Sequence, residues 1–340
     1  MTPLAAAPGG VLVMGAGAIG CYVGGRLALA GAAVEFVGRP RVIEALRARG
    51  LSLVEPDGTR GSLAADRLSL HEAVPAGTTP ALVLLCVKSG ATDDAARALA
   101  AALPGGTPVV SLQNGLHNAE IAQRAAPGLR VAAGMVPYNV VELEPATWLR
   151  GSAGALALQD VPATRAWLPA LRAAGLPTGL HVDMRAVQWG KLLLNLNNPV
   201  NALAGRPLRE QLLDADLRAT TAVLMSEALA LLRRAREPVA RATPLPPGAL
   251  PWLLRLPTPL FAPLARRLLQ VDPRARSSMA DDLALGRRTE IDALSGEVVR
   301  LAQEHGLSAP RNSRMVSLLE AWPQQPKRWT ARQLQDALGL

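Results

Sequence analysis

The stretch VLVMGAGAIG, residues 11–20, decides the fold that this 340-residue sequence predicts. Its start, VLVMG, is typical of a buried strand, and the segment 18–30 has the character of a helix closed by a glycine. Between them the glycines stand in G-x-G-x-x-G spacing, which indicates a dinucleotide-binding turn when it joins a strand to a helix. Gly15 permits the tight turn, Gly17 lets the backbone approach a pyrophosphate, and Gly20 lets helix and strand pack closely. The alternative is a tight glycine-rich turn without a ligand.

The start of the predicted helix adds to this turn. The first N–H groups of a helix lack partners within it, and its positive dipole end favours phosphate groups. The predicted cofactor-binding turn comprises Gly15, Ala16, Gly17, Ala18, Ile19 and Gly20.

Outward from the turn, short apolar runs alternate with helical segments through the first half of the chain. This alternation predicts an α/β domain with a doubly wound parallel Rossmann sheet. Further strands are expected at 33–37, 81–87 and 108–112, shorter extended pieces that can pair antiparallel at 131–160, and a helix at 162–175.

The character of the sequence changes near residues 180–184, after which helical periodicity dominates. We therefore expect a dinucleotide-binding domain over 1–183 and an all-helical substrate or dimerisation domain over 184–340. Residues 238–273 contain nine prolines and predict an irregular insertion with room for one short helix. A lid, an oligomer contact and a passive insertion all fit that segment.

The net charge of +9 comes from arginine, because Lys88, Lys191 and Lys327 are the only lysines. No basic run exceeds two residues and no aromatics lie between the arginines, so we expect no nucleic-acid partner. Cys21 and Cys86 have no metal-ligand spacing, and no metal site is expected. The sequence shows no signal peptide and no apolar run long enough for a membrane span, which favours a cytoplasmic protein.

The end of the second strand bears on the choice of cofactor. An acid there would bind the ribose 2′-hydroxyl of NAD, whereas a basic residue favours the 2′-phosphate of NADP. The chain reads VEFVGRP at 34–40, so Arg39 follows the strand and Glu35 lies inside it. We predict NADP(H), with Glu35 as the competing candidate and a solvated surface charge as the alternative for Arg39.

Two further polar residues end predicted strands. Lys88 ends LVLLCVK and Asn114 ends VVSLQNG. Ligands of open parallel sheets bind outside the carboxyl ends of the strands, so both residues are candidates for the site. The Asn-Gly pair at 114–115 is also a common turn signal, which is the alternative for Asn114.

The segment QWGKLLLNLNNPVN, residues 188–201, sets a cation and four asparagines among leucines. At about 100° per residue, Lys191, Asn195 and Asn198 fall within one narrow stripe of a helix. Pro199 denies a hydrogen bond to the carbonyl of Asn195, so the helix can bend there. Lys191 is a candidate proton donor to a carbonyl substrate, and a packed helix face with satisfied amides is the alternative.

Another polar group lies in SSMADDLALGRRTEIDAL, residues 277–294. Ser278 and Asp281 fit a capping box at a helix start. Glu290 stands twelve residues beyond Ser278, so the two share a face only if the segment bends, for example at Gly286.

These motifs, in this order over about residues 10–310, resemble the ketopantoate reductase (2-dehydropantoate 2-reductase) family. The resemblance rests on GAGAIG, VGR after the second strand, a strand ending in VK, QNG, W-x-K-L-x-x-N, SSM and R-R-T-E-I-D. It implies an NADPH-binding Rossmann domain joined to a helical domain, a 2-keto acid substrate and a step of pantothenate biosynthesis. The oligomeric state is left undecided, and a homodimer is one option.

The resemblance also implies roles for single residues. Lys191 would protonate the nascent alkoxide while hydride goes to the 2-keto carbon, and Glu290 would hold the substrate hydroxyl. Ser278 and Asn195 would contact the substrate, Asn114 would lie near the nicotinamide, and Lys88 and Arg39 would serve the cofactor, with Arg39 at the 2′-phosphate.

The chain departs from the family pattern at Leu208 and Ala275, where well-studied members carry substrate-binding asparagines. Two alternatives therefore stay open. One is a reductase of another 2-keto acid or an opine-type substrate on the same scaffold, and the other is a silent NADP-binding sensor.

Overall fold

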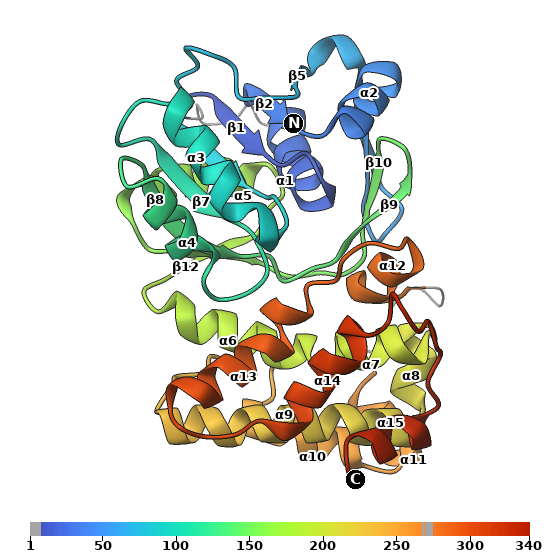
Figure 1. Cartoon of the computed structure of the whole chain (residues 1–340). Helices are drawn as coiled ribbons and strands as arrows, with labels where there is room; N and C mark the ends of the chain where they lie inside the picture. Colours follow the sequence, from blue (N-terminus) through green and yellow to red (C-terminus); the bar gives the residue numbers. More distant parts are fainter. Residues whose placement is uncertain (1–7, 267–268, 270–274) are drawn as a thin grey trace. The chain divides into compact units, whose positions relative to one another are not determined.

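The computed structural model describes residues 8–266, 269 and 275–340 (Figure 1). The chain divides into two compact units, Met1–Met184 and Arg185–Leu340.

The first unit is built on a doubly wound sheet. In the described part of the chain its eight strands have the order β12-β11-β8-β7-β6-β1-β2-β5. Six of them, from β8 through β5, run parallel in the order of a Rossmann fold, and the direction of winding changes between β1 and β6. Strand β11 pairs antiparallel with β8, and β12 is parallel to β11. The strands are β1 (Val11–Met14), β2 (Val34–Val37), β5 (Ser69–His71), β6 (Leu82–Leu85), β7 (Pro108–Ser111), β8 (Arg130–Met135), β11 (Leu156–Gln159) and β12 (Thr178–His181). The predicted fold class is confirmed.

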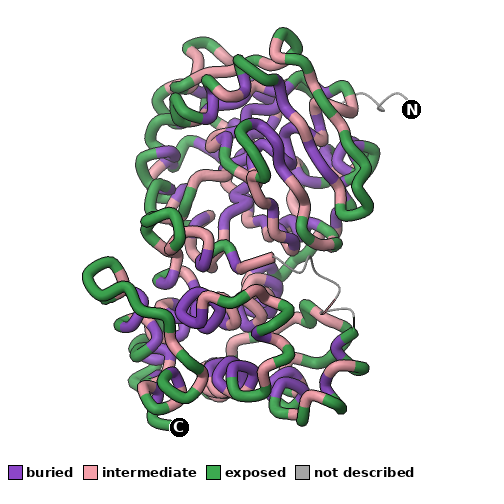
Figure 2. The backbone as a smooth tube through the Cα atoms, turned by 90° about the vertical axis from the view of Figure 1, so that its right-hand side faces the viewer, coloured by how far each residue is buried: buried purple, intermediate pink, exposed green. Residues whose placement is uncertain are grey.

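Alternation along the strands supplies a core on each face of this sheet. The central strands β1, β6 and β7 are mostly buried, whereas the edge strand β5 is not (Figure 2 colours the buried backbone purple). Val11 and Val13 pack with α1 (Ala18–Leu29) and α5 (Pro162–Ala173) on one face. Leu12, between them in sequence, packs with α3 (Thr92–Ala102) and α4 (Asn118–Ala125) on the other. Helix α2 (Pro40–Arg49) follows β2.

A second sheet covers α1 on its other side, and the sequence did not predict half of it. Its order is β4-β3-β10-β9, with β3 (Leu51–Val54), β4 (Arg60–Leu63), β9 (Val140–Glu144) and β10 (Thr147–Arg150). The predicted antiparallel pairing within 131–160 is confirmed for β9 with β10. Two successive glycines let α1 lie between sheets: a Cβ at Gly24 would meet Phe36 at 2.8 Å, and one at Gly25 would meet Leu51 at 2.8 Å.

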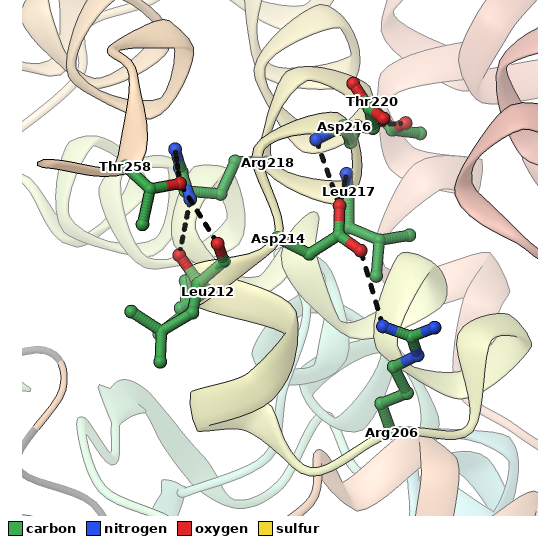
Figure 3. Close-up of polar contacts among 9 residues, drawn as sticks. Arg206, Leu212, Asp214, Asp216, Leu217, Arg218, Thr220 and Thr258 are labelled. Atoms are coloured by element: carbon green, nitrogen blue, oxygen red, sulfur yellow. Dashed lines mark hydrogen bonds and ion pairs between the residues drawn. The ribbon is translucent and has the colours of Figure 1, made fainter. Parts of the chain in front are cut away.

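Every regular element among the described residues of the second unit is helical, as predicted. The helices are α6 (Met184–Asn195), α7 (Asn197–Ala204), α8 (Leu208–Leu213), α9 (Ala215–Ala235), α10 (Leu250–Arg255), α11 (Thr258–Leu264), α12 (Ser278–Ala284), α13 (Ser295–Glu304), α14 (Pro310–Glu320) and α15 (Ala331–Ala337). Helix α9 is the longest, and Asp214 caps its start by accepting hydrogen bonds from the amides of Asp216 and Leu217 (Figure 3). None of the described helices is both long and apolar enough to cross a bilayer.

The proline-rich segment is more regular than predicted, because a buried arginine of α9 organises it. The guanidinium of Arg218 donates to the carbonyls of Leu212, Leu254 and Leu256 at 2.8–3.2 Å (Figure 3 shows Leu212). It also lies 4.2 Å from the ring centre of Phe261. The expectation of an irregular insertion with one short helix was therefore wrong for 250–264, which forms α10 and α11 against α9. Residues 267–268 and 270–273 of the insertion lie outside the described residues.

Candidate active site

At two of the three glycines of the turn the packing leaves no space for a side chain, and at the third it does. Gly15 has φ +109°, and a Cβ there would lie 2.6 Å from the amide nitrogen of Val87. A Cβ at Gly20 would overlap the carbonyl oxygen of Gly15 and lie 2.8 Å from Val13. A Cβ at Gly17 would meet no atom within 4 Å. Gly15 and Gly20 are thus explained by packing, whereas Gly17 borders open space where a ligand can lie.

The start of α1 is suited to an anion. Its first turn contains no acidic residue, and Gly17 at the N-cap adds no side chain that could cap the amides. Ala18, Ile19 and Gly20 are the first residues of the helix, where N–H groups have no carbonyl one turn earlier. The amide of Ala16 instead donates to a carbonyl of β2 at 2.8 Å, so Ala16 anchors the turn.

Glu35, the acidic candidate near the end of β2, already contacts two neighbouring side chains. Glu35 accepts a hydrogen bond from Thr78 at 2.9 Å and lies 3.4 Å from the imidazole of His71. Arg39, exposed at the N-cap of α2, stands two residues after the end of the strand. This arrangement leaves a guanidinium rather than a carboxylate to meet a ligand group at the strand end.

Beyond β6 and β7, buried side chains bind two loops to each other. The Thr92 hydroxyl accepts from Gln113 at 2.7 Å and lies 2.8 Å from both the Ser89 carbonyl and Asn118 Oδ1. The amide of Asn118 donates to the carbonyl of Asn114 and to the Ser89 hydroxyl. Thr92, Gln113 and Asn118 are each at most 8% exposed, so this network is shielded from water.

The network fixes the loops that carry two predicted site residues. Lys88 is exposed three residues after the end of β6, and the partly buried Asn114 lies three residues after the end of β7. The strands end earlier than the sequence suggested, but both residues still follow the carboxyl ends of neighbouring parallel strands. Thr92, Gln113 and Asn118 were not predicted, because a buried threonine and two amides carry no recognisable spacing.

In the second unit, the asparagine-rich segment forms two helices rather than one. Helix α6 ends at Asn195 and α7 begins at Asn197, with Leu196 between them. This is the bend expected from Pro199, which has no N–H to donate to the Asn195 carbonyl.

Two of the four asparagines serve the fold. Asn197 Oδ1 accepts from Gln211 at 2.7 Å, and the fully buried Asn201 donates to Gln211 Oε1 at 2.7 Å. Asn201 Oδ1 also accepts from the amide of Ser277 at 2.9 Å, which fixes the start of α12 against α7. Asn195 and Asn198 are partly exposed, and no side-chain hydrogen bond of either is recorded within the described residues.

The capping box expected for Ser278 and Asp281 was wrong, because the helix is capped one residue earlier and by a single hydrogen bond. Ser277 is the N-cap of α12, and its hydroxyl accepts from the amide of Ala280 at 3.2 Å. Ser278 is exposed as the first residue of the helix. Its side chain is therefore not needed for the cap.

Lys191 and Glu290 interact electrostatically within the second unit. Helix α12 ends before Gly286, which has φ +61°, so the segment bends there and Glu290 follows in a non-helical stretch. Burial lowers the pKa of the Lys191 ammonium from 10.5 to about 8, and the nearby charge of Glu290 opposes that shift. An ammonium with such a pKa can release a proton near neutral pH.

The fold and this geometry define a Rossmann-type dinucleotide-binding protein whose helical unit contains a lysine of lowered pKa. Comparisons with known proteins specify the family. The model "Ketopantoate reductase PanE/ApbA" matches residues 11–163, and the model of the C-terminal domain of that family matches residues 183–322. The chain belongs to the ketopantoate reductase family and is an oxidoreductase.

Relatives and solved structures agree with this assignment. The chain is 30% identical to a 2-dehydropantoate 2-reductase of Mycobacterium tuberculosis, over 92% of this chain and 97% of that protein. It is 29% identical to one from Halobacterium salinarum, over 88% and 94%. A ketopantoate reductase structure from Ralstonia eutropha aligns with TM-score 0.78 at 29% identity, over 93% of this chain and 99% of that one.

Proposed function

We propose that the protein reduces 2-dehydropantoate to pantoate with NADPH. The observation that carries the proposal is Lys191, whose pKa burial lowers to about 8 beside Glu290 in a chain of this family. The open space at Gly17 and the acid-free start of α1 fit a dinucleotide, and Arg39 at the end of β2 fits the 2′-phosphate.

The residues of the chain have separate tasks in this reaction. Bound NADPH supplies a hydride to the 2-keto carbon. The Lys191 ammonium donates a proton to the carbonyl oxygen, so the C=O double bond becomes a C–OH group and the lysine leaves the step neutral. Glu290 accepts a hydrogen bond from the 4-hydroxyl of the substrate.

Three further residues complete the proposed substrate and cofactor contacts. Asn195 and Ser278 provide polar groups for the substrate on two elements of the helical unit, and both are at least partly exposed. Asn114 borders the nicotinamide, with Lys88 on the neighbouring loop at the cofactor. The network around Thr92 holds these two loops in place.

One observation favours a second candidate substrate. The amide of Leu208 donates to the carbonyl of Ala275 at 2.8 Å, so the two positions that depart from the family pattern lie next to each other. Two adjacent apolar residues replace two amides there, which favours a 2-keto acid with an apolar side chain over one with a hydroxyl.

Steady-state kinetics with two substrates separates these candidates. NADPH oxidation is followed with 2-dehydropantoate and with 2-ketoisovalerate, which carries hydrogen in place of the hydroxymethyl group. A hydrogen bond to a charged group contributes about 1.5–3 kcal/mol, so kcat/KM should favour 2-dehydropantoate by about tenfold to a hundredfold. Glu290→Gln should lose most of that preference.

The outcomes distinguish the alternatives. Equal kcat/KM for both substrates in the wild type would reject 2-dehydropantoate as the true substrate and leave the reductase chemistry at Lys191 standing. NADPH binding without turnover of any 2-keto acid would instead support a silent sensor.

The proposal extends to assembly and location. A homodimer in the cytoplasm is the state we expect, and one solved neighbour of the same fold is described as a dimeric ketopantoate reductase from Staphylococcus aureus. Light scattering after size-exclusion chromatography measures the mass, and a value near 35.6 kDa would reject the dimer.

A further inference from the structure

A concave site in the helical unit lies outside the residues discussed so far. It is a pocket of ≈ 470 Å³ formed by one side of α9, the end of α10, the start of α14 and Leu340. Three guanidinium groups line it, from Arg234, Arg255 and Arg311. This arginine pocket contains neither Lys191 nor Glu290. Its volume lies in the range of small-molecule sites, about 300–1,000 Å³.

The positive charge of the arginine pocket is poorly balanced. Glu227 is the only acid that lines it among the described residues. The Glu227 carboxylate caps α14 by accepting from the amides of Arg311 and Asn312 at 2.8–3.1 Å, and it lies 3.8 Å from the Arg311 guanidinium. Three guanidinium groups therefore share one acidic side chain, which is already bound at a helix start, and the terminal residue Leu340.

Arg234 and Arg255 are the two arginines of the pocket that make no ion pair with an acidic side chain among the described residues. Arg255 donates to the Ser226 hydroxyl and the Pro251 carbonyl, at 3.1–3.2 Å. Guanidinium groups bind carboxylate and phosphate oxygens through paired, charge-assisted hydrogen bonds. Arg234 and the remaining N–H groups of Arg255 can make such bonds.

The rest of the lining is amphipathic. Ser226 and Ser308 add hydroxyl groups beside the arginines, whereas Val223, Ala230, Leu231 and Pro310 give an apolar wall. A ligand that fills the pocket must therefore place an anionic group at the arginines and an apolar part on α9.

We propose that the arginine pocket binds a small organic anion with a short apolar chain. The anionic group is a carboxylate or a phosphate monoester, which both present oxygens to the guanidinium groups. This site is separate from the reductase site, and its occupation does not depend on the reaction assigned above.

Calorimetric titration of the full-length protein tests the proposal. The probes are hexyl phosphate and hexanoate, with inorganic phosphate and hexan-1-ol as the anionic and the apolar half alone. Excess NADP⁺ is present throughout so that the probes do not report on the nucleotide turn. Hexyl phosphate or hexanoate should bind more tightly than either half, and binding should weaken as salt is added.

Variants show whether the binding occurs in this pocket. Arg234→Gln with Arg255→Gln should weaken the tighter probe at least about tenfold, because two charge-assisted contacts are lost. The matched control, Arg314→Gln with Arg332→Gln, removes the same charge from exposed positions of the same unit and should change the affinity by less than about twofold. Reductase turnover should be unchanged in both double variants.

A third variant tests the volume without changing the charge. Ala230→Phe places a ring on the apolar wall and should also abolish binding of the tighter probe. The proposal is overturned if no probe binds the wild type, if both double variants lose affinity equally, or if Ala230→Phe binds as the wild type does. Binding of inorganic phosphate as tight as that of hexyl phosphate would overturn the amphipathic ligand class.

Discussion

The Lys191 ammonium should destabilise the folded protein, and its pKa sets the size of the effect. Burial lowers that pKa from 10.5 to about 8. The difference, 10.5 − 8, corresponds to roughly 3 kcal/mol of penalty on the charged form in the folded state. Between pH 8 and 10.5 the unfolded chain keeps a proton that the folded chain has released, so stability rises with pH in that window. Below pH 8 the whole penalty applies.

Lys191→Met is the perturbation that removes this charge while keeping an unbranched side chain. At pH 7 the variant should be more stable than the wild type by up to roughly 3 kcal/mol, and the difference should vanish as pH approaches 10.5. The same variant should lose about 10²–10⁴-fold in kcat, because a positioned proton donor contributes that much.

Urea unfolding at several pH values measures the first effect, and NADPH oxidation measures the second. In the wild type, kcat/KM should fall as pH rises through about 8, since only protonated Lys191 can donate. Glu290→Gln should move this fall to lower pH, because the carboxylate raises the lysine pKa. Lys327→Met is the control: Lys327 is exposed, 4.5 Å from the ring centre of Trp329, and its loss should leave both pH profiles unchanged.

Two results would refute this reasoning. If Lys191→Met were no more stable than the wild type at pH 7, the ammonium would be well solvated. If the wild-type rate also stayed constant to pH 10, Lys191 would not be the proton donor, and its stripe would be a packed helix face.

The glycine turn gives a pair of predictions: Gly17→Ala should keep the melting temperature but raise KM for NADPH, whereas Gly20→Ala should lower the melting temperature because its Cβ overlaps a backbone carbonyl. An unfolded Gly17→Ala protein would contradict the first. Arg39→Ala should raise KM for NADPH and hardly change the use of NADH, because the lost charge-assisted bonds go to the 2′-phosphate; equal losses would make Arg39 structural. Thr92→Val should lower stability by roughly 1–3 kcal/mol and raise KM for NADPH, because a buried amide loses its acceptor. Thr92→Ser keeps the hydroxyl and should restore both quantities, and a Thr92→Ser protein as impaired as Thr92→Val would show that the methyl group matters instead.

The parallel sheet could be predicted because its signals are local. The strand at 11–14 carries its apolar run, its turn and its helix within twenty residues, and the later strands repeat that pattern. Strands β3 and β4 lack such a signal: RGSL at 60–63 has one large apolar residue, and its pairing with β3 is decided by contacts with α1. Tertiary contacts of this kind are not visible in a four-residue window.

The proline-rich segment shows the same limit at a single residue. Arg218 is one arginine among 33, and nothing in its neighbours shows that it is 1% exposed. Its role follows from three carbonyls that approach it from α8 and the α10 region. Because those carbonyls lie up to 38 residues away, the order they give to α10 and α11 could not be deduced from prolines alone.

The asparagine-rich segment shows how the helix break and the chemistry are connected. A straight helix would place Asn201 about 280° around from Lys191, whereas the break at Leu196 starts a new helix whose direction is fixed by Asn197 and Asn201. Those two amides bind Gln211 and the start of α12, so they are not available to a ligand. The bonds that hold α12 in turn hold the chain that leads through Gly286 to Glu290, the charge that acts on Lys191. The segment thus needs many amides because Asn197 and Asn201 fix the position of α12, and our proposal assigns the substrate contact to the partly exposed Asn195.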